Sequence, residues 1–239
     1  MSTKEMLVDG KGKKIYSTED PGIVLVHYTD VASAYGGIKT ASIKDKGKCN
    51  NAISAFAFEA MTAAGIPNHF ISLENEREQL CRKVTMIPLQ TIVRNRLAGT
   101  TAAMLGLKNG AEISNTVFEL RYNCRSLGNP MINEHHAVAL GIVTYEEVGE
   151  ILDLAKRTNE VLKDTFHKAG IELVDFKMEC GKDAEGHIII ADEISPDNCR
   201  LWDEKSGEIL DKDRFRHDMS DVCISYRTIM ERLSKSVKL

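Results

Sequence analysis

Residues 175–193, DFKMECGKDAEGHIIIADE, predict a β-hairpin that carries acids and a lysine on one face. Side chains of a strand alternate between its faces, so Asp175, Lys177 and Glu179 share one face and the apolar residues between them share the other. Folding the chain at the KDAEG turn sets Glu179 opposite Asp192, with their β-carbons within roughly 5 Å of each other. The hairpin therefore predicts two neighbouring carboxylates beside a lysine.

Two ionised carboxylates at this separation repel each other, and without a cation the pKa of one of them should rise. Mg²⁺ removes the conflict, because it binds one or two protein carboxylates and completes its shell with phosphate oxygens and water. Glu179 and Asp192 are thus candidate metal ligands, and Lys177 could neutralise a phosphate or a substrate carboxylate. The alternative is a solvated polar face of an edge hairpin, on which Lys177 pairs with the acids.

The composition of the 239 residues narrows the class of protein. Hydrophobic residues make up 43% and charged residues 28%, the ordinary balance of a soluble globular protein. The net charge of −4 and the lack of a long basic run argue against nucleic-acid binding. No apolar run approaches the roughly 18 residues of a membrane helix, so a cytoplasmic protein is expected. The six scattered cysteines are expected to be reduced.

Helices and strands alternate along the chain with hairpins among them, which predicts the α+β class. Apolar spacing predicts helices over 48–64, from a Thr144/Glu147 capping box to Gly170, and over about 218–234. Strands are expected at 23–28, 69–73 and 79–95, the last of them broken at Pro88. This break is the candidate hinge between a smaller domain, 1–87, and a larger domain, 88–239.

The segment GKGKKIY (10–16) combines two glycines with three lysines just before an apolar strand. Glycine lets backbone N–H groups approach a phosphate closely, and lysine supplies positive charge. The segment is not a Walker A motif, and a flexible surface loop explains it equally well. Together with a metal-binding hairpin, it suggests a nucleoside triphosphate held between two elements.

Two further segments suit a phosphate. VRNRLAGTT (93–101) places Arg94 and Arg96 before an expected helix start, and SPDNCRLWD (195–203) places Arg200 directly after the hairpin. An arginine in either segment, taken alone, is more typical of a surface salt bridge. Two phosphate-type sites and a metal pair together imply ATP and a second phosphorylated substrate.

The chain resembles the phosphoribosylaminoimidazole-succinocarboxamide synthase (SAICAR synthetase) family of purine biosynthesis. The matching motifs run in order along nearly the whole chain: GKGKKIY, GIPNHFI (65–71), VRNRLAGT, INEHHA (132–137), VDFKMECG (174–181), ADEISPDNCRLWD (191–203) and DKDRFR (211–216). The resemblance implies antiparallel sheets with flanking helices, related to the ATP-grasp and protein-kinase nucleotide-binding folds. ATP would lie between the smaller, nucleotide-covering domain and the larger domain, which would hold the metal and substrate.

The family joins L-aspartate to the carboxylate of carboxyaminoimidazole ribotide (CAIR), with ATP going to ADP and phosphate through an acyl phosphate. Positioning and charge neutralisation by Mg²⁺ and lysines would carry this phosphoryl transfer. A homodimer is also expected from the resemblance.

The resemblance assigns roles to individual positions. Contacts to ATP are expected from Lys11, Gly12, Lys13, Lys83 and Met86. Contacts to substrate are expected from Arg94, Thr100 and Arg200 for the CAIR phosphate, from Asp175 and Lys177 for its ribose and ring, and from Lys212, Arg214 and Arg216 for carboxylates. The expected catalytic group is Asp175, Lys177, Glu179 and Asp192, with Glu179 and Asp192 holding Mg²⁺.

Several positions depart from the family pattern. Thr100 replaces the usual serine and keeps its hydroxyl. Gly36 and Asn129 replace residues with other side chains, and a lysine and acidic residues are common where this chain has Asn123-Cys124-Arg125. These departures leave open a related ATP-dependent amide ligase that uses another amine or carboxylate. A non-catalytic nucleotide- or CAIR-binding protein is a further alternative, although such a protein has no need of both Glu179 and Asp192.

Overall fold

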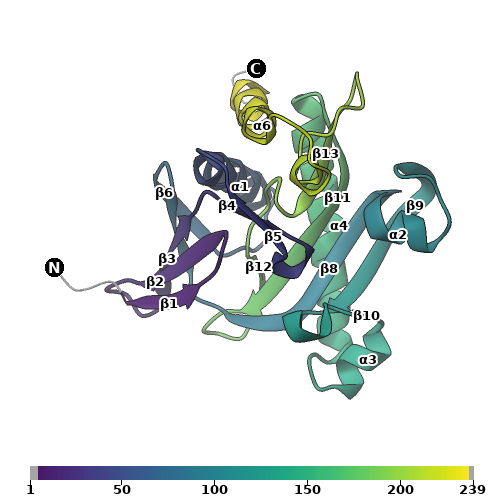
Figure 1. Cartoon of the computed structure of the whole chain (residues 1–239). Coiled ribbons are helices and arrows are strands. Elements are labelled where there is room, and N and C mark those ends of the chain that lie inside the picture. The colour runs from purple at the N-terminus through teal and green to yellow at the C-terminus, as the bar shows by residue number, and fades with distance from the viewer. Residues whose placement is uncertain (1–4, 237–239) are drawn as a thin grey trace.

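A five-stranded antiparallel sheet forms the smaller part of the computed structural model, which describes residues 5–236. Its strand order is β1-β2-β3-β7-β6, and it lies beside the larger sheet in Figure 1. The strands are β1 (Met6–Asp9), β2 (Lys13–Ser17), β3 (Ile23–Tyr28), β6 (Phe70–Asn75) and β7 (Glu78–Arg82). The sheet buries alternate residues of β3 and β7 against each other, including Val24, Val26 and Cys81.

The larger sheet has six antiparallel strands built around the hairpin predicted from the sequence. Its order is β10-β9-β8-β11-β12, and β13 also pairs with β11. The strands are β8 (Thr85–Leu97), β9 (Ala111–Tyr122), β10 (Met131–Ile132), β11 (Ile171–Lys182), β12 (Ile188–Ala191) and β13 (Cys199–Asp203). β13 pairs with the first half of β11 and β12 with its last residues, so the segment 192–198 crosses the edge of β11 between them.

Three long helices surround the main core: α1 (Lys46–Ala63), α4 (Tyr145–Lys168) and α6 (Val222–Ser236). α4 packs on β11 and β8, and α1 contacts α4, α6 and the smaller sheet (Figure 1). Phe58 of α1, Phe166 of α4 and Phe176 of β11 are fully buried in one apolar cluster. The helix predicted from the capping box is confirmed, since Thr144 and Glu147 make both reciprocal bonds.

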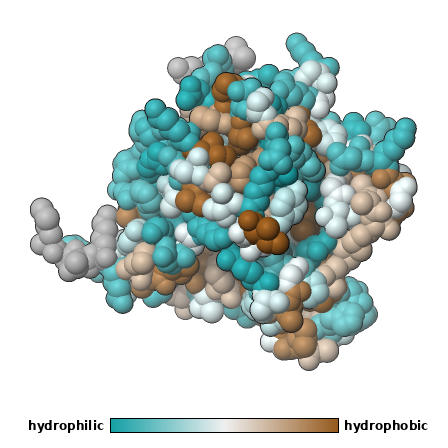
Figure 2. All heavy atoms as spheres, viewed as in Figure 1, coloured by the Kyte–Doolittle hydropathy of each residue, from teal (hydrophilic) through white to brown (hydrophobic). Residues whose placement is uncertain are grey.

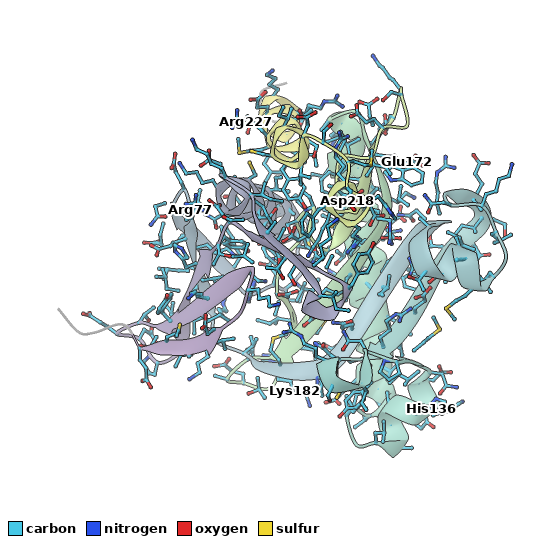
Figure 3. The ribbon with its side chains drawn as sticks, in the orientation of Figure 1. Arg77, His136, Glu172, Lys182, Asp218 and Arg227 are labelled. Atoms are coloured by element: carbon cyan, nitrogen blue, oxygen red, sulfur yellow. The ribbon has the colours of Figure 1, made fainter. Side chains whose placement is uncertain are left out.

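Short elements complete the described chain. They are η1 (Tyr35–Gly37), α2 (Gly99–Met104), η2 (Arg125–Leu127), α3 (Glu134–Ala139), α5 (Asp213–Arg216) and a hairpin of β4 (Val31–Ala34) and β5 (Lys39–Ser42). The tip of the β4–β5 hairpin rests on α5 and the loop after it. Tyr35 Oη donates to Arg216 O at 3.0 Å, and Lys39 Nζ lies 2.6 Å from Asp218 Oδ1, a residue labelled in Figure 3.

The α+β class is confirmed, but the expected strand break at Pro88 is wrong. β8 runs through Pro88, and the missing N–H falls where the β8–β11 register shifts, opposite the stretch between Glu179 and Gly181. A bulge tolerates proline because its residues need not donate to the ladder. The two sheets are instead joined at residues 83–84. The domains 1–87 and 88–239 remain a prediction, and their first four and last three residues lie outside the described chain.

The surface is mixed in polarity. In the view of Figure 2, hydrophilic residues cover much of the face, and hydrophobic residues gather on the lobe that carries α3. Met131 and Leu140 are exposed in this region. Among the described residues, no helix has the length and apolar character needed to cross a membrane. The six cysteines are free thiols.

Candidate active site

The segment between β12 and β13 brings several polar side chains to Lys177 in the middle of β11. Lys177 N donates to Asn198 O at 2.9 Å, which fixes the segment against the strand. Lys177 Nζ donates to Asp192 Oδ2 at 3.0 Å and also bonds Glu179 Oε1. The lysine therefore links the two carboxylates that the hairpin pattern singled out.

The predicted register of the hairpin is wrong by one residue. Glu179 pairs with Ala191, and the five-residue turn 183–187 is centred on Glu185. Asp192 lies just beyond β12 and has a φ of 66°, in the left-handed region that aspartate tolerates better than most residues. This backbone turn, rather than a cross-strand pair, directs the Asp192 carboxylate toward Lys177.

Lysines from two sheets neutralise this acidic group. Lys13 of β2 bonds Asp192 Oδ1, and its Nζ lies 3.5 Å from Glu193 Oε1. Burial alone would lower the pKa of Lys13, but the charges of Asp192 and Glu193 outweigh it and raise that pKa. Burial alone would likewise raise the pKa of Asp192, whereas Lys13 and Lys177 hold it well below its usual range. The carboxylate is half-buried and favoured in its ionised form by two lysines. Lys177 pairs with the acids as the alternative supposed, but β11 is an inner strand and not the edge of the sheet.

A cavity of about 800 Å³ opens between the two sheets above this group. All five residues expected to contact ATP line it: Lys11, Gly12, Lys13, Lys83 and Met86. Apolar side chains from β1, β2 and β3 line another part of its wall, among them Val8, Ile15 and Val24. An apolar wall next to lysines and carboxylates is suited to a molecule with a flat ring at one end and phosphates at the other.

A second cavity of about 280 Å³ adjoins the first on the larger sheet and contains Arg94 and Arg200. Arg94 is buried and forks onto Glu119, with Nε–Oε1 at 2.6 Å and Nη2–Oε2 at 3.0 Å. Asp175 Oδ2 accepts from Arg94 Nη1 and from Arg200 Nη1, each at 2.8 Å. Burial raises the pKa of Asp175, opposing the two arginines that favour its ionised form. The cavity thus has a cationic floor held in place by buried acids.

Two of the expected substrate contacts do not line either cavity. Arg214 is a buried residue of α5, and its guanidinium donates to Ser220 O and Ile209 O and pairs with Glu208. Thr100 is exposed at the first turn of α2. The turn itself lies at the cavity, because a Cβ on Gly99 (φ +61°) would collide with the Arg200 guanidinium. Lys212 lines the larger cavity, and Arg216 lines both.

The sequence interpretation missed a buried ion pair that supports the floor of both cavities. Asp197 Oδ2 forms an ion pair with Lys46 Nζ at 2.6 Å, and Asp197 Oδ1 accepts from Tyr226 Oη at 2.9 Å. Burial alone would raise the pKa of Asp197, but Lys46 leads the groups that lower it to about 2. Lys46 opens α1, two residues before the expected helix start at 48, and stands between Lys44 and Lys48, so the sequence gave no signal that this lysine meets position 197. Burial also lowers the pKa of Lys212 nearby.

Glu179 and Asp192 also fit a divalent cation by their chemistry. Oxygen atoms of both carboxylates lie within hydrogen-bonding reach of one atom, Lys177 Nζ. Hard oxygen donors that converge on one point are the donor set that Mg²⁺ prefers. In the described part of the chain, the group of three possible metal ligands that converge lies at the β11–β12 turn, where Asp183, Glu185 and His187 meet outside both cavities; Glu179 and Asp192 are not in that group, and Lys177 Nζ occupies the point where they converge.

The fold and the two adjoining cavities define a class of enzyme that brings a nucleoside phosphate to a second anionic substrate. Comparison with protein families matches residues 6–233 to SAICAR synthetase. The chain is 51% identical to phosphoribosylaminoimidazole-succinocarboxamide synthase of Clostridium acetobutylicum over 234 residues, 98% of this chain and 99% of that protein. It is 50% identical to the enzyme of the same name from Clostridium botulinum over 235 residues, 98% of this chain and 100% of that protein.

Solved structures agree. The crystal structure of phosphoribosylaminoimidazole-succinocarboxamide synthase from Ehrlichia chaffeensis matches with a TM-score of 0.94 at 38% identity, over 96% of this chain and 98% of that chain. A SAICAR synthetase in complex with ADP matches with a TM-score of 0.92 at 41% identity, over 95% and 97% of the two chains. The chain belongs to the SAICAR synthetase family and is a ligase.

Proposed function

We propose that this protein joins L-aspartate to the carboxylate of CAIR, consuming ATP and releasing SAICAR, ADP and phosphate. The observation that carries the proposal is the wall between the two cavities. Six residues line both of them: Gln90, Asn129, Lys177, Asp197, Asn198 and Arg216. A nucleotide in the larger cavity and a phosphorylated substrate in the smaller one would therefore meet at Lys177.

The nucleotide would lie with its base against the apolar side chains of the smaller sheet and its phosphates toward Lys11 and Lys13. Gly12, between these lysines, leaves room for the phosphates, and Lys83 and Met86 would lie along the nucleotide. The bound ADP of the related SAICAR synthetase supports this choice of ligand. The larger cavity, at about 800 Å³, is also within the range typical of small-molecule sites.

CAIR would place its phosphate toward Arg200 and Arg94 and its carboxylate toward Lys177. A carboxylate oxygen of CAIR then attacks the γ-phosphorus, so an O–P bond forms and the bond to the β-phosphate oxygen breaks, releasing ADP. The aspartate amine next attacks the carbonyl carbon of the acyl phosphate, and the C–O bond to phosphate breaks. Lys13 and Lys177 would hold the anionic groups in line, which is the main requirement for phosphoryl transfer.

Glu179 and Asp192 would hold Mg²⁺ at this wall. When bound, the ion supplies positive charge to the phosphate oxygens, and the chain's own lysines add to it. Lys177 lines both cavities, so with the ion bound to the two carboxylates its ammonium group would be free to bond a phosphate oxygen.

The carboxylates of L-aspartate would be recognised by Lys212 and Arg216. Both side chains line the larger cavity near the shared wall, and Arg216 extends to the smaller one. Arg214 is left out of this proposal because its guanidinium is engaged under α5. A cytoplasmic homodimer rests on the family resemblance, and sedimentation at equilibrium tests its oligomeric part.

The test is phosphate release from ATP with Mg²⁺ and CAIR, with and without L-aspartate, while SAICAR is followed by mass. Release that depends on aspartate and yields SAICAR supports the proposal. Turnover with another amino acid in place of aspartate would indicate a related amide ligase, the alternative raised by Gly36, Asn123 and Asn129. ATP binding without phosphate release from any mixture would indicate a binding protein.

A further inference from the structure

Two neutral amides donate to the carboxylate of Glu179, one to each oxygen, and Lys177 also bonds the oxygen that Gln90 contacts. Gln90 Nε2 donates to Glu179 Oε1 at 3.0 Å, and Asn123 Nδ2 donates to Glu179 Oε2 at 3.0 Å. Gln90 Nε2 also donates to Asn123 Oδ1 at 3.1 Å, which joins the amides to each other. Gln90 and Asn123 together are called the amide clamp below.

The backbone fixes both members of the clamp. Gln90 lies directly across from Glu179 in the β8–β11 pairing. Asn123 follows the last residue of β9, and its N–H donates to Pro88 O at 2.9 Å, two residues before Gln90. Gln90 is 8% exposed and Glu179 9%, so solvent competes little for the bond between them, whereas Asn123 is half-buried. Gln90 is therefore positioned by the strand pairing, and Asn123 by the bond from its N–H to Pro88 O.

The amide clamp carries no net charge, and this decides how it acts on Glu179. An amide donor orients a carboxylate without adding positive charge, whereas a lysine in the same place would orient it and also cancel part of its charge. Glu179 consequently has its orientation set by Gln90 and Asn123 while its negative charge is left for Lys177 or a divalent cation. Hydrogen-bond donors to a ligating carboxylate commonly tune metal affinity in this way.

We propose that Gln90 and Asn123 are positioning residues that hold Glu179 in the orientation in which it binds the divalent cation of the metal–nucleotide complex. This inference rests on the proposed function, because it takes Glu179 as a metal ligand. It adds two residues to the site and gives Asn123 the role of a neutral donor to Glu179.

The test measures binding of Mn²⁺ with ADP by electron paramagnetic resonance, in the whole protein and without turnover. Asn123→Ala and Gln90→Ala should each weaken Mn²⁺ affinity roughly tenfold, the lower end of the usual effect of such outer partners. Asn95→Ala is the matched control, since Asn95 lies on the same strand as Gln90, bonds Asn159 at 2.8 Å and lines neither cavity. It should lower the unfolding midpoint and leave Mn²⁺ affinity unchanged.

A double variant separates positioning from general damage. If the clamp acts through Glu179, then adding Asn123→Ala to Glu179→Gln should weaken Mn²⁺ binding no further than Glu179→Gln alone. Two outcomes would overturn the positioning role of the clamp and leave the metal assignment of Glu179 standing. One is a further tenfold loss of Mn²⁺ affinity in the double variant. The other is wild-type affinity in both clamp variants while Glu179→Gln binds weakly. Wild-type Mn²⁺ affinity in Glu179→Gln overturns the metal assignment of the proposed function and the clamp with it.

Discussion

Replacing Arg200 by lysine tests the smaller cavity, because it keeps the positive charge and removes the fork. Arg200 Nε donates to Asp213 Oδ2 and Nη1 to Asp175 Oδ2, both at 2.8 Å. These two bonds orient the guanidinium so that Nη2 lies beside Gly99 at the start of α2. A lysine can pair with one of the acids or point into the cavity, but it cannot do both.

The expected loss follows from the bonds that the fork would make to the CAIR phosphate. Hydrogen bonds to charged groups contribute about 1.5–3 kcal/mol each. Losing one of them should raise the KM for CAIR roughly 10- to 150-fold, since each 1.4 kcal/mol corresponds to about a factor of ten. The KM for ATP should change less than about twofold, because Arg200 does not line the larger cavity.

The assay is the initial rate of SAICAR formation against CAIR concentration at saturating ATP and aspartate, with thermal unfolding run in parallel. Arg96→Lys is the matched control, because Arg96 pairs with Glu172 and Glu112 and lines neither cavity. An unchanged KM for CAIR in Arg200→Lys, or an effect confined to ATP, would refute the placement of the phosphate.

Three further changes probe the metal site, the buried network and pH dependence. Glu179→Gln should abolish Mg²⁺-dependent turnover while circular dichroism stays that of the wild type; full activity would remove it from the metal site. Arg94→Ala strands the buried carboxylates of Glu119 and Asp175, so the free energy of unfolding in urea should fall by about 3–5 kcal/mol; a smaller CAIR-specific effect with intact stability would contradict the buried network. Burial lowers the pKa of His69 to about 4, so the unfolded chain binds more protons between that pH and about 6.5, and stability falls as the pH drops through this window. His69→Phe should remove that loss, which reaches roughly 3 kcal/mol near pH 4; an equal pH slope in variant and wild type would show that His69 is not its source.

Local sequence patterns predicted the three long helices and the hairpin at the site, but not every strand. The Thr144/Glu147 capping box and the apolar spacing after it depend on neighbours three or four residues apart, and the helix starts where they indicate. Strand alternation likewise placed Lys177 and Glu179 on one face. These features depend only on residues close in sequence, so they can be predicted without knowing how the rest of the protein packs.

Register and strand continuity were harder to predict, because both depend on residues that are distant in the sequence. The one-residue error between Glu179 and Asp192 arose because turn length sets the register, and the KDAEG composition allows more than one turn length. The continuity of β8 through Pro88 depends on a bulge against β11, a strand more than 80 residues away in sequence. Whether a proline interrupts a strand depends on the partner strand, which the local sequence does not reveal.

The sequence by itself therefore determined the α+β class, the three long helices, part of the strands and the residue types of the site, while β9 and the β4–β5 hairpin were not predicted. Its family motifs also indicated the chemistry. Only the tertiary structure decided that Lys13 meets Asp192, that Lys46 meets Asp197, that Gln90 and Asn123 hold Glu179, and that Arg214 lies outside the site. Each of these contacts joins side chains from different elements, and their energies depend on burial and pairing that exist only once the two sheets and their helices have packed.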